Sequence, residues 1–441
     1  MSPLTLSASG PGASAIAIWH RWRRRLGIAF AGQVSVQLLS FATALLLLRW
    51  MDEVEYAKIG LVLGFQSTFS TFVDLGVGGS LVALIGGRFN EPQVVGRYVA
   101  AARWWRRLLL VVVLPLGALA FWFFIQRQGW PWHEGAVLYA CIALTLLSAG
   151  VTAWASAPLL LQQRLGTLYA VSNAAAVLRL AGCGLLYATG WLDAVTLTVL
   201  GTAVSAVTAQ CYWHAARRHI DEPRRSEAAW RGEIGRYVAP LVPVVIFYAV
   251  QGQLATFLIA WFGQAQQIAE ITALGRLAQL FAFVSALFGM LVMPYFGRVG
   301  DHVFTHRYRW AMVGIVALAA AVSGAAFVLP EPLLWLLGSR YDHLLQEVGW
   351  VVLAGALGFA GGAVWSVHAV RKWVFWRGTA LYIGSVVVAQ TLFVALVPLD
   401  STLNVLLMNV VASATALLAQ VPIACMGLAR DARNARLDRA G

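Results

Sequence analysis

Apolar runs of about twenty residues recur along the chain, each long enough to cross a hydrocarbon core of roughly 30 Å. The runs are continuous and do not alternate with polar residues, which predicts helices that pair their own backbone groups, not the strands of a barrel. The sequence therefore predicts an all-α, polytopic membrane protein with twelve transmembrane helices. The expected spans are residues 26–48, 59–86, 108–125, 136–160, 165–190, 194–213, 237–262, 271–296, 310–329, 346–370, 374–397 and 402–428.

The basic residues predict which side of the membrane each loop faces. Most of the 32 Lys and Arg residues fall in the two tails and in every second loop, which the positive-inside rule assigns to the cytoplasm. The alternate loops hold Arg49, Lys58, Arg127 and Arg340. Both termini are therefore expected in the cytoplasm, and the connections on the outer side are short.

The longest hydrophilic segment, residues 214–236, divides the spans into six and six. This division predicts two six-helix lobes around a central cavity, an arrangement typical of transporters built from repeats. The expected parts are an N-terminal cytoplasmic tail (1–25), an N-lobe (26–213), a cytoplasmic linker (214–236), a C-lobe (237–428) and a C-terminal cytoplasmic tail (429–441).

Charge and motif content exclude several classes of protein. The net charge of +13 follows from topology and attraction to anionic headgroups, because no soluble domain carries a basic stripe for nucleic acid. The four cysteines lack CxxC or His-paired spacing, so neither a disulfide framework nor a metal site is expected. No nucleotide-binding or hydrolase motif is present, which indicates a protein without catalytic residues or a cofactor, and not an enzyme.

The stretch FVDLGVGG, residues 72–79, lies inside the second expected span. A carboxylate at Asp74, near the centre of a hydrocarbon layer, is tolerated if it faces a hydrated cavity or pairs with a cation, for which Arg179 is one candidate. Gly76, Gly78 and Gly79 either let the helix bend as a hinge or permit the close approach of a neighbouring helix. Both interpretations of the glycines stay open.

Several segments carry a resemblance to a known family. The first span ends at Arg49, the acidic loop DEVEY follows at 52–56, and DLG lies in the second span at 74–76. With LLGSRYDHLLQEVGWVVLAGALGF at 336–359 and VMPYFGRV at 292–299, this order resembles the Wzx-type polysaccharide flippases of the multidrug/oligosaccharidyl-lipid/polysaccharide (MOP) exporter superfamily.

The resemblance implies a flippase in the bacterial inner membrane. Such a protein moves a polyprenyl-diphosphate-linked oligosaccharide from the cytoplasmic to the outer leaflet for surface or exopolysaccharide synthesis. Its expected partners are that cargo, membrane lipids and, as further candidates, a polysaccharide polymerase and glycosyltransferases, with no nucleic acid. The chain departs from the family in the seventh helix, where Gln251 and Gln253 replace a frequent Asp-Arg pair and no charge follows until Glu270.

A diphosphate and a sugar chain cross hydrocarbon only in a hydrated cavity with cationic side chains. Arg179, at the midpoint of the fifth span, is too deep to reach the headgroups, so we expect it to bind the diphosphate or to form a structural ion pair. Arg276 and Arg49, near the outer ends of their spans, either reach the headgroups or contact the cargo. With Arg88 at the inner mouth and Asp74, they complete the expected substrate-binding set.

Two alternatives stay open, and the span count argues against a third class, the lipid II flippases. A MATE-like antiporter for drugs or small molecules would need coupling carboxylates, and Asp74 is essentially the only carboxylate within the expected spans. A membrane-embedded polysaccharide polymerase or ligase would be expected to have a large outward loop, whereas the outward loops here are short. A lipid II flippase would be expected to have fourteen spans.

Overall fold

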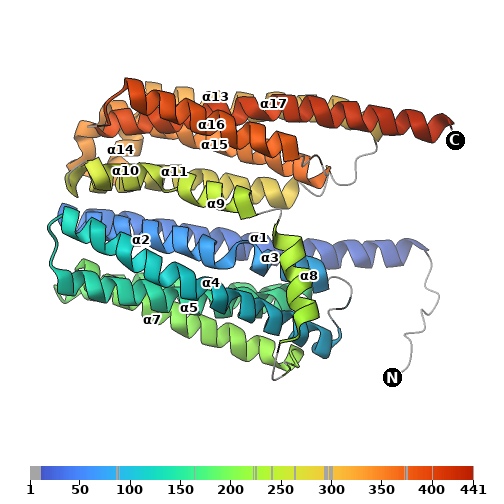
Figure 1. Ribbon diagram of the computed structural model, residues 1–441, viewed down its shortest axis with the longest axis horizontal. Coiled ribbons are helices and arrows are strands. Elements are labelled where there is room, and N and C mark those ends of the chain that lie inside the picture. Colours follow the sequence, from blue (N-terminus) through green and yellow to red (C-terminus); the bar gives the residue numbers. More distant parts are fainter. Residues whose placement is uncertain are drawn as a thin grey trace.

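The computed structural model describes residues 11–440 except 86–87, 89, 163, 222, 224–225, 240–241, 263–264, 293–295, 297–300, 372, 374–375 and 400. Within this part the chain is helical and has no strand, which confirms the all-α prediction. The helices form two groups that lie side by side, one from each half of the chain (Figure 1). We refer to these groups as the N-lobe and the C-lobe.

Each lobe is a bundle of consecutive helices, and a short linker joins the two. The N-lobe holds α1 (Pro11–Trp50), α2 (Glu53–Asp74), α3 (Val77–Ile85), α4 (Pro92–Arg127), α5 (Trp132–Leu161), α6 (Leu165–Ala188) and α7 (Ala194–Ala216). The linker holds the short 3-10 helix η2 (Arg217–His219) and α8 (Ala228–Val238). The C-lobe holds α9 (Val242–Gln251), α10 (Leu254–Phe262), α11 (Ala265–Leu291), α13 (Asp301–Val328), α14 (Glu331–Leu337), η4 (Ser339–Leu344), α15 (Leu345–Val370), α16 (Trp376–Leu396) and α17 (Thr402–Ala440).

Ten helices in the described residues are each long and apolar enough to cross a membrane. The second and seventh expected spans are divided into shorter helices, α2 with α3 and α9 with α10. The chain is therefore a multi-pass membrane protein in which ten expected crossings are single helices and two are broken.

Several helices extend beyond their expected bounds. α4 starts at Pro92 and not at residue 108, so much of the expected basic loop is helical. α1 starts at Pro11 and α17 ends at Ala440, so both expected tails continue helices. α11 starts at Ala265, which places Glu270 inside a helix and not in the outer loop. Hydropathy locates only the apolar middle of a helix, which explains these errors.

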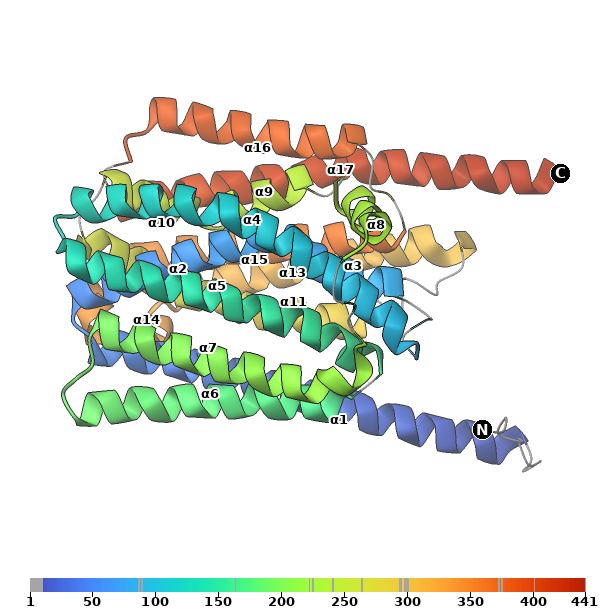
Figure 2. The same cartoon turned by 60° about the horizontal axis from the view of Figure 1, so that its bottom comes forward.

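The two ends of the bundle differ. α1 and α17 extend beyond the other helices at one end, which we call the terminal end (Figure 1). α8 runs across the other helices near this end, and Figure 2 views it nearly along its axis. The opposite end, where α1 is followed by α2, is called the shut end because the lobes pack together there. The positive-inside prediction would place the terminal end in the cytoplasm.

The linker helix α8 is fastened to α4 of the N-lobe. The Tyr98 hydroxyl donates to the Glu233 carboxylate (3.0 Å) and accepts from the Arg88 guanidinium (3.1 Å). The Trp105 indole donates to the carbonyl of Arg231 (2.9 Å). Because α9 follows α8 closely along the chain, these contacts connect the N-lobe to the first half of the broken seventh span.

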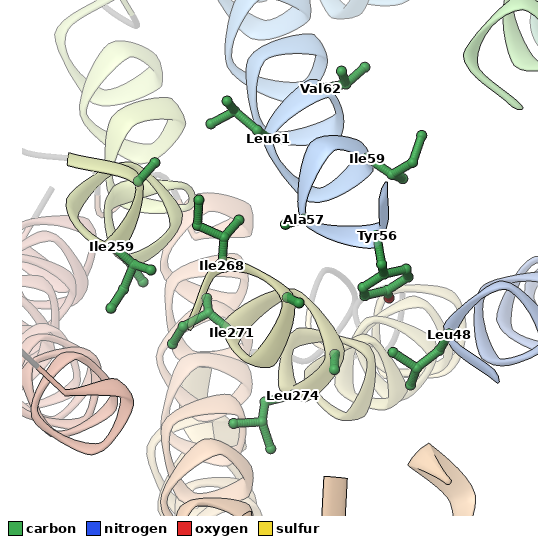
Figure 3. Packing of buried hydrophobic residues seen from close by; sticks show 14 of the residues in the cluster. Leu48, Tyr56, Ala57, Ile59, Leu61, Val62, Ile259, Ile268, Ile271 and Leu274 are labelled. Atoms are coloured by element: carbon green, nitrogen blue, oxygen red, sulfur yellow. The ribbon is translucent and has the colours of Figure 1, made fainter. Parts of the chain in front are cut away.

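Apolar side chains of both lobes pack together at the shut end, and we call this interface the seam (Figure 3). Leu61 and Ile59 of α2 belong to the same buried cluster as Ile268 and Ile271 of α11. α2 approaches α11 closely, and a Cβ atom at Gly60 would overlap the side chain of Thr272. A residue without a side chain is therefore needed at this crossing, since small residues let helices approach in membranes.

Polar side chains also cross the seam and donate to carbonyls at the ends of helices in the other lobe. The contacts run from Arg49 to Trp335 (2.7 Å), from Arg340 to Met51 (2.5 Å), from Arg127 to Trp261 (3.2 Å) and from Gln128 to Ala260 (2.8 Å). Carbonyls in the last turn of a helix have no partner in their own helix, and the helix dipole favours a cation there. Each lobe therefore supplies donors that the other lobe's helix ends require.

The first prediction concerns the helix crossing at Gly60. Gly60→Leu should push α2 away from α11, since overpacking costs roughly 1–3 kcal/mol, and should expose the seam. The reporter is Ala57→Cys, at a position buried at the seam, in a chain whose native cysteines are replaced by serine. Its alkylation rate should rise about tenfold. Gly201→Leu on α7 is the matched control, because Gly201 has open space around it. Equal alkylation rates in the two variants would show that the crossing does not hold the seam shut.

Candidate functional site

A cavity of about 470 Å³ lies inside the N-lobe, among α1, α5, α6 and α7. Its lining is rich in hydroxyl groups, which come from every one of these helices. They belong to Ser40, Thr43, Thr145, Thr152, Ser172, Ser205, Thr208 and Tyr212. Hydroxyl groups therefore share the lining with a larger apolar surface.

Most of these hydroxyls already use their proton within the protein. Thr43 donates to the carbonyl of Leu39 (2.7 Å), and Thr208 donates to that of Val204 (2.7 Å), each within its own helix. Ser205 donates in the same way to a carbonyl of the preceding turn (2.8 Å). A hydroxyl that has given its proton still has lone pairs, so these oxygens can accept hydrogen bonds from a ligand.

Arg179 is the only charged residue among the described residues that line this cavity. It comes from the middle of α6, as the sequence predicts. No described residue forms a hydrogen bond or ion pair with its guanidinium, and Arg179 is exposed in the structure. The cavity therefore combines an unpaired cation with a wall of hydroxyl acceptors, which suits a ligand that carries both negative charge and hydroxyl groups.

Asp74 does not pair with Arg179, and that suggestion from the sequence is wrong. Its carboxylate accepts hydrogen bonds from the backbone amides of Gly76 (3.2 Å) and Gly78 (3.0 Å) at the start of α3. Helix-initial amides have no partner in their own helix, so Asp74 caps the helix that follows the break. Leu75 and Gly76 both have positive φ, 43° and 87°, which turns the chain between α2 and α3.

The cation nearest to Asp74 is Arg106, which the sequence pattern assigns to a cytoplasmic loop. Its guanidinium lies 4.0 Å from the Asp74 carboxylate and donates to the carbonyl of Leu146 (2.6 Å). Arg106 is 5% exposed, and Gly150 leaves space for it, since a Cβ there would overlap the side chain. The sequence gives no sign that Arg106 is buried, because its basic and aromatic neighbours are typical of a loop at the membrane surface.

The other members of the expected binding set lie elsewhere. Arg88 contacts Tyr98 near the terminal end, and Arg49 donates across the seam to Trp335. Arg276 is buried and donates to the Tyr56 hydroxyl (3.0 Å), also across the seam. None of them lines the cavity of Arg179, so the structure does not bring the expected arginines into one lumen. Of Gly76, Gly78 and Gly79, Gly76 marks a real helix break, and hinge motion there stays a prediction.

Sequence reasoning missed Glu270, a buried carboxylate in α11. Its oxygens accept hydrogen bonds from Gln266 (3.2 Å) and Thr402, and it lies 3.1 Å from the His343 ring. All four groups belong to the C-lobe near the shut end. The charge is visible in the sequence, but the predicted start of the eighth span excludes it by one residue.

Lys58 is predicted only as a basic residue of an outer loop. It is buried and contacts two carboxylates, Glu55 (2.7 Å) and Glu134 (2.6 Å). Glu55 also accepts from the backbone amide of Ala194 at the start of α7 (2.8 Å). This cluster fastens the starts of α2, α5 and α7 to one another at the shut end, so its role is structural.

No family model and no curated protein matches the sequence. The structure, in contrast, is similar over nearly its whole length to solved transporters. It matches the eukaryotic MATE transporter AtDTX14 at 13% identity, with a TM-score of 0.57, over 95% of this chain and 99% of that chain. It matches a mutant of the Vibrio cholerae MATE transporter VcmN at 14% identity, with a TM-score of 0.53, over 96% of this chain and 98% of that chain.

A third similar structure is a MOP superfamily transporter from Pyrococcus furiosus. It shares 12% identity and a TM-score of 0.63, over 92% of this chain and 95% of that chain, and is described by a binding pocket of reverse polarity that suggests a different function. The chain has the fold of MOP transporters. At such low identity the similarity concerns the fold alone, and the resemblance to Wzx-type flippases is not distinguished from a resemblance to MATE transporters.

The second prediction compares Asp74, whose charge stabilises the fold, with Arg179, whose charge lies in the cavity. Asp74→Ala should lower the free energy of unfolding by roughly 2–4 kcal/mol, because α3 loses its cap and Arg106 keeps a buried charge without a counter-ion. The double change Asp74→Ala with Arg106→Met should recover part of that loss. Arg179→Ala should change stability by less than about 0.5 kcal/mol. Thermal unfolding of the purified variants in one detergent measures all three, and equal losses for Asp74→Ala and Arg179→Ala would contradict the assignment.

Proposed function

We propose that the chain is a transporter of the MOP superfamily that flips a polyprenyl-diphosphate-linked oligosaccharide across a membrane by alternating access. The observation that carries this proposal is the cavity in the N-lobe, where Arg179 is the single charge among the described lining residues. An unpaired cation deep in a membrane protein is costly, about 2.5–3.5 kcal/mol or more on insertion scales, unless a partner compensates it. A cargo diphosphate would be that partner.

The hydroxyl lining supports the same cargo. A sugar carries several hydroxyl donors, and the cavity offers oxygens such as those of Thr43, Ser205 and Thr208 as acceptors. A volume of about 470 Å³ is in the range of ligand pockets and holds a diphosphate with its nearest sugar. The lipid tail would stay in the surrounding bilayer, so only the polar part of the cargo needs this site.

The seam supports an alternating-access cycle in which the lobes rock against each other. The contacts of Arg49, Arg340 and Arg127 join the lobes at the shut end. If the terminal end faces the cytoplasm, this state is closed toward the outside, as required for loading from the cytoplasmic leaflet. We therefore infer a bacterial inner-membrane protein with cytoplasmic termini, working with glycosyltransferases and a polysaccharide polymerase that make and use its cargo.

A second candidate function is a MATE-like antiporter for small molecules. The observation that favours it is Glu270, because a buried carboxylate inside a lobe is a group that a coupling proton or sodium ion could bind. The positive charge of Arg179 in the N-lobe cavity argues against an organic cation as cargo, because the two cations would repel each other. The two functions differ in the sign of charge on the cargo, which an experiment can determine.

The third prediction tests the cargo in cells. Deleting the gene in its host should remove a surface or secreted glycan while lipid-linked precursor accumulates at the inner leaflet, because the polar head cannot cross hydrocarbon unaided. Glycan staining and extraction of lipid-linked sugars measure the two effects. The host must lack a redundant flippase. Normal glycan with new sensitivity to cationic drugs would instead support the antiporter.

The fourth prediction tests Arg179 itself. In the deletion strain, Arg179→Ala should fail to restore glycan, whereas Arg179→Lys should restore part of it, because an ammonium still attracts phosphate without the paired geometry of a guanidinium. Leu178→Ala is the matched control, because Leu178 is exposed on the same turn of α6 and carries no charge. All three proteins should accumulate equally in the membrane. Full restoration of glycan by Arg179→Ala would show that Arg179 does not contribute to cargo binding.

A further inference from the structure

A second cavity, of about 740 Å³, lies on the seam at the shut end. Leu48 and Arg49 of the N-lobe form one wall, and α14 with η4 of the C-lobe forms the other. We call it the vestibule. Its walls come from both lobes, so the vestibule exists only while the seam is shut.

The charges of the vestibule balance. Arg49 and Arg340 line it together with the carboxylates of Glu331 and Asp342. Two cations and two anions give no net attraction for a free phosphate or for a metal ion. They do present planar groups that donate and accept in pairs, which matches adjacent hydroxyl groups on a neutral ligand.

An aromatic ring completes the lining. Trp335 of α14 is 74% exposed, and the Arg49 guanidinium lies over its ring at 5.5 Å. The indole carries an apolar face beside a polar edge, so it suits a ligand that is apolar on one side and polar on the other. A pyranose ring is such a ligand, with C–H groups on its faces and hydroxyls around its edge.

The two arginines are held in place without a ligand. Arg49 donates to the carbonyl of Trp335 (2.7 Å), and Arg340 donates to that of Met51 (2.5 Å). Arg49 makes a further, longer bond to the carbonyl of Leu336 (3.4 Å), so at most two of the five N–H groups of either guanidinium are used and donors remain for a ligand. Binding then orders few side chains, which lowers its entropic cost.

We propose that the vestibule is a binding site for a neutral oligosaccharide segment, and that its occupant stabilises the shut seam. The proposal rests on the proposed function, because the glycan of the cargo, once moved to that side, is the sugar available there. A ligand that binds one of two conformations shifts the equilibrium toward it. Glycan that accumulates on the outer side would therefore slow the opening of the seam and hence its own export.

The experiment uses the full chain in lipid nanodiscs that are free of sugar-based detergent. The probes are maltotriose, cellotriose and chitotriose at millimolar concentration, with saturation-transfer NMR as the readout. At least one trisaccharide should bind to the wild type. Trp335→Ala and Asp342→Asn should each weaken that binding about tenfold or more. Trp335→Phe should retain part of it, because a flat apolar face remains.

Trp191 provides the matched control. It is 71% exposed at the same end of the bundle and lies outside the lining of the vestibule. Trp191→Ala should bind the trisaccharide as the wild type does. Equal losses in Trp191→Ala and Trp335→Ala would mean that Trp335 belongs to an interfacial aromatic belt, and absence of binding by all three probes would also overturn the proposal.

A conformational readout tests the second half of the proposal. The bound trisaccharide should slow alkylation of Ala57→Cys, the reporter of the seam, and should have no effect on it when Trp335→Ala is also present. Unchanged alkylation with binding intact would overturn the stabilising role. Failure of this proposal and failure of the proposed function give different results. Glycan loss on gene deletion without trisaccharide binding would refute this site alone. Trisaccharide binding without a glycan defect would refute the flippase.

Discussion

A backbone amide or carbonyl without a partner costs several kcal/mol in hydrocarbon, where no water can replace the missing bond. At several places where a helix of this protein ends or breaks, a charged side chain from another segment meets that need. Asp74 caps α3 after the break in the second span, and Glu55 accepts from the first amide of α7. Arg340 and Arg49 bind carbonyls that follow or end helices of the opposite lobe. This constraint explains why these charges are retained inside a membrane protein.

Arg179 differs from these residues because no described group pairs with it. Arg106, in the same lobe, has the Asp74 carboxylate and a carbonyl as partners. The contrast is informative, because both arginines lie on membrane-spanning helices, and only Arg106, which is buried, has its charge compensated within the protein. A charge that the fold itself does not use is the natural candidate for contact with a cargo.

The two cavities differ in charge as well as in place. The cavity of Arg179 lies inside one lobe and has one cation, so it can stay intact while the lobes move. The vestibule is lined by both lobes and is balanced in charge, so a separation of the lobes would take it apart. A ligand in the first cavity can therefore travel with its lobe, whereas a ligand in the second acts on the conformational equilibrium. Glu270, buried beside the seam in the C-lobe, is placed where a bound ion could act on the same equilibrium.

The sequence by itself determined the membrane-spanning class, the helix content and the approximate spans, because a continuous apolar run has one stable backbone arrangement in hydrocarbon. It also placed Arg179 near the middle of its helix and marked Gly76 as a weak point of the second span, without deciding between a bend and close packing of a neighbouring helix. Tertiary structure alone decided which charges meet. The pairing of Asp74 with Arg106 and the separation of Arg49, Arg88 and Arg276 depend on how distant helices pack side by side. That packing depends on the shapes of facing side chains, such as Gly60 against Thr272. Local patterns along the sequence do not show which distant residues will face each other.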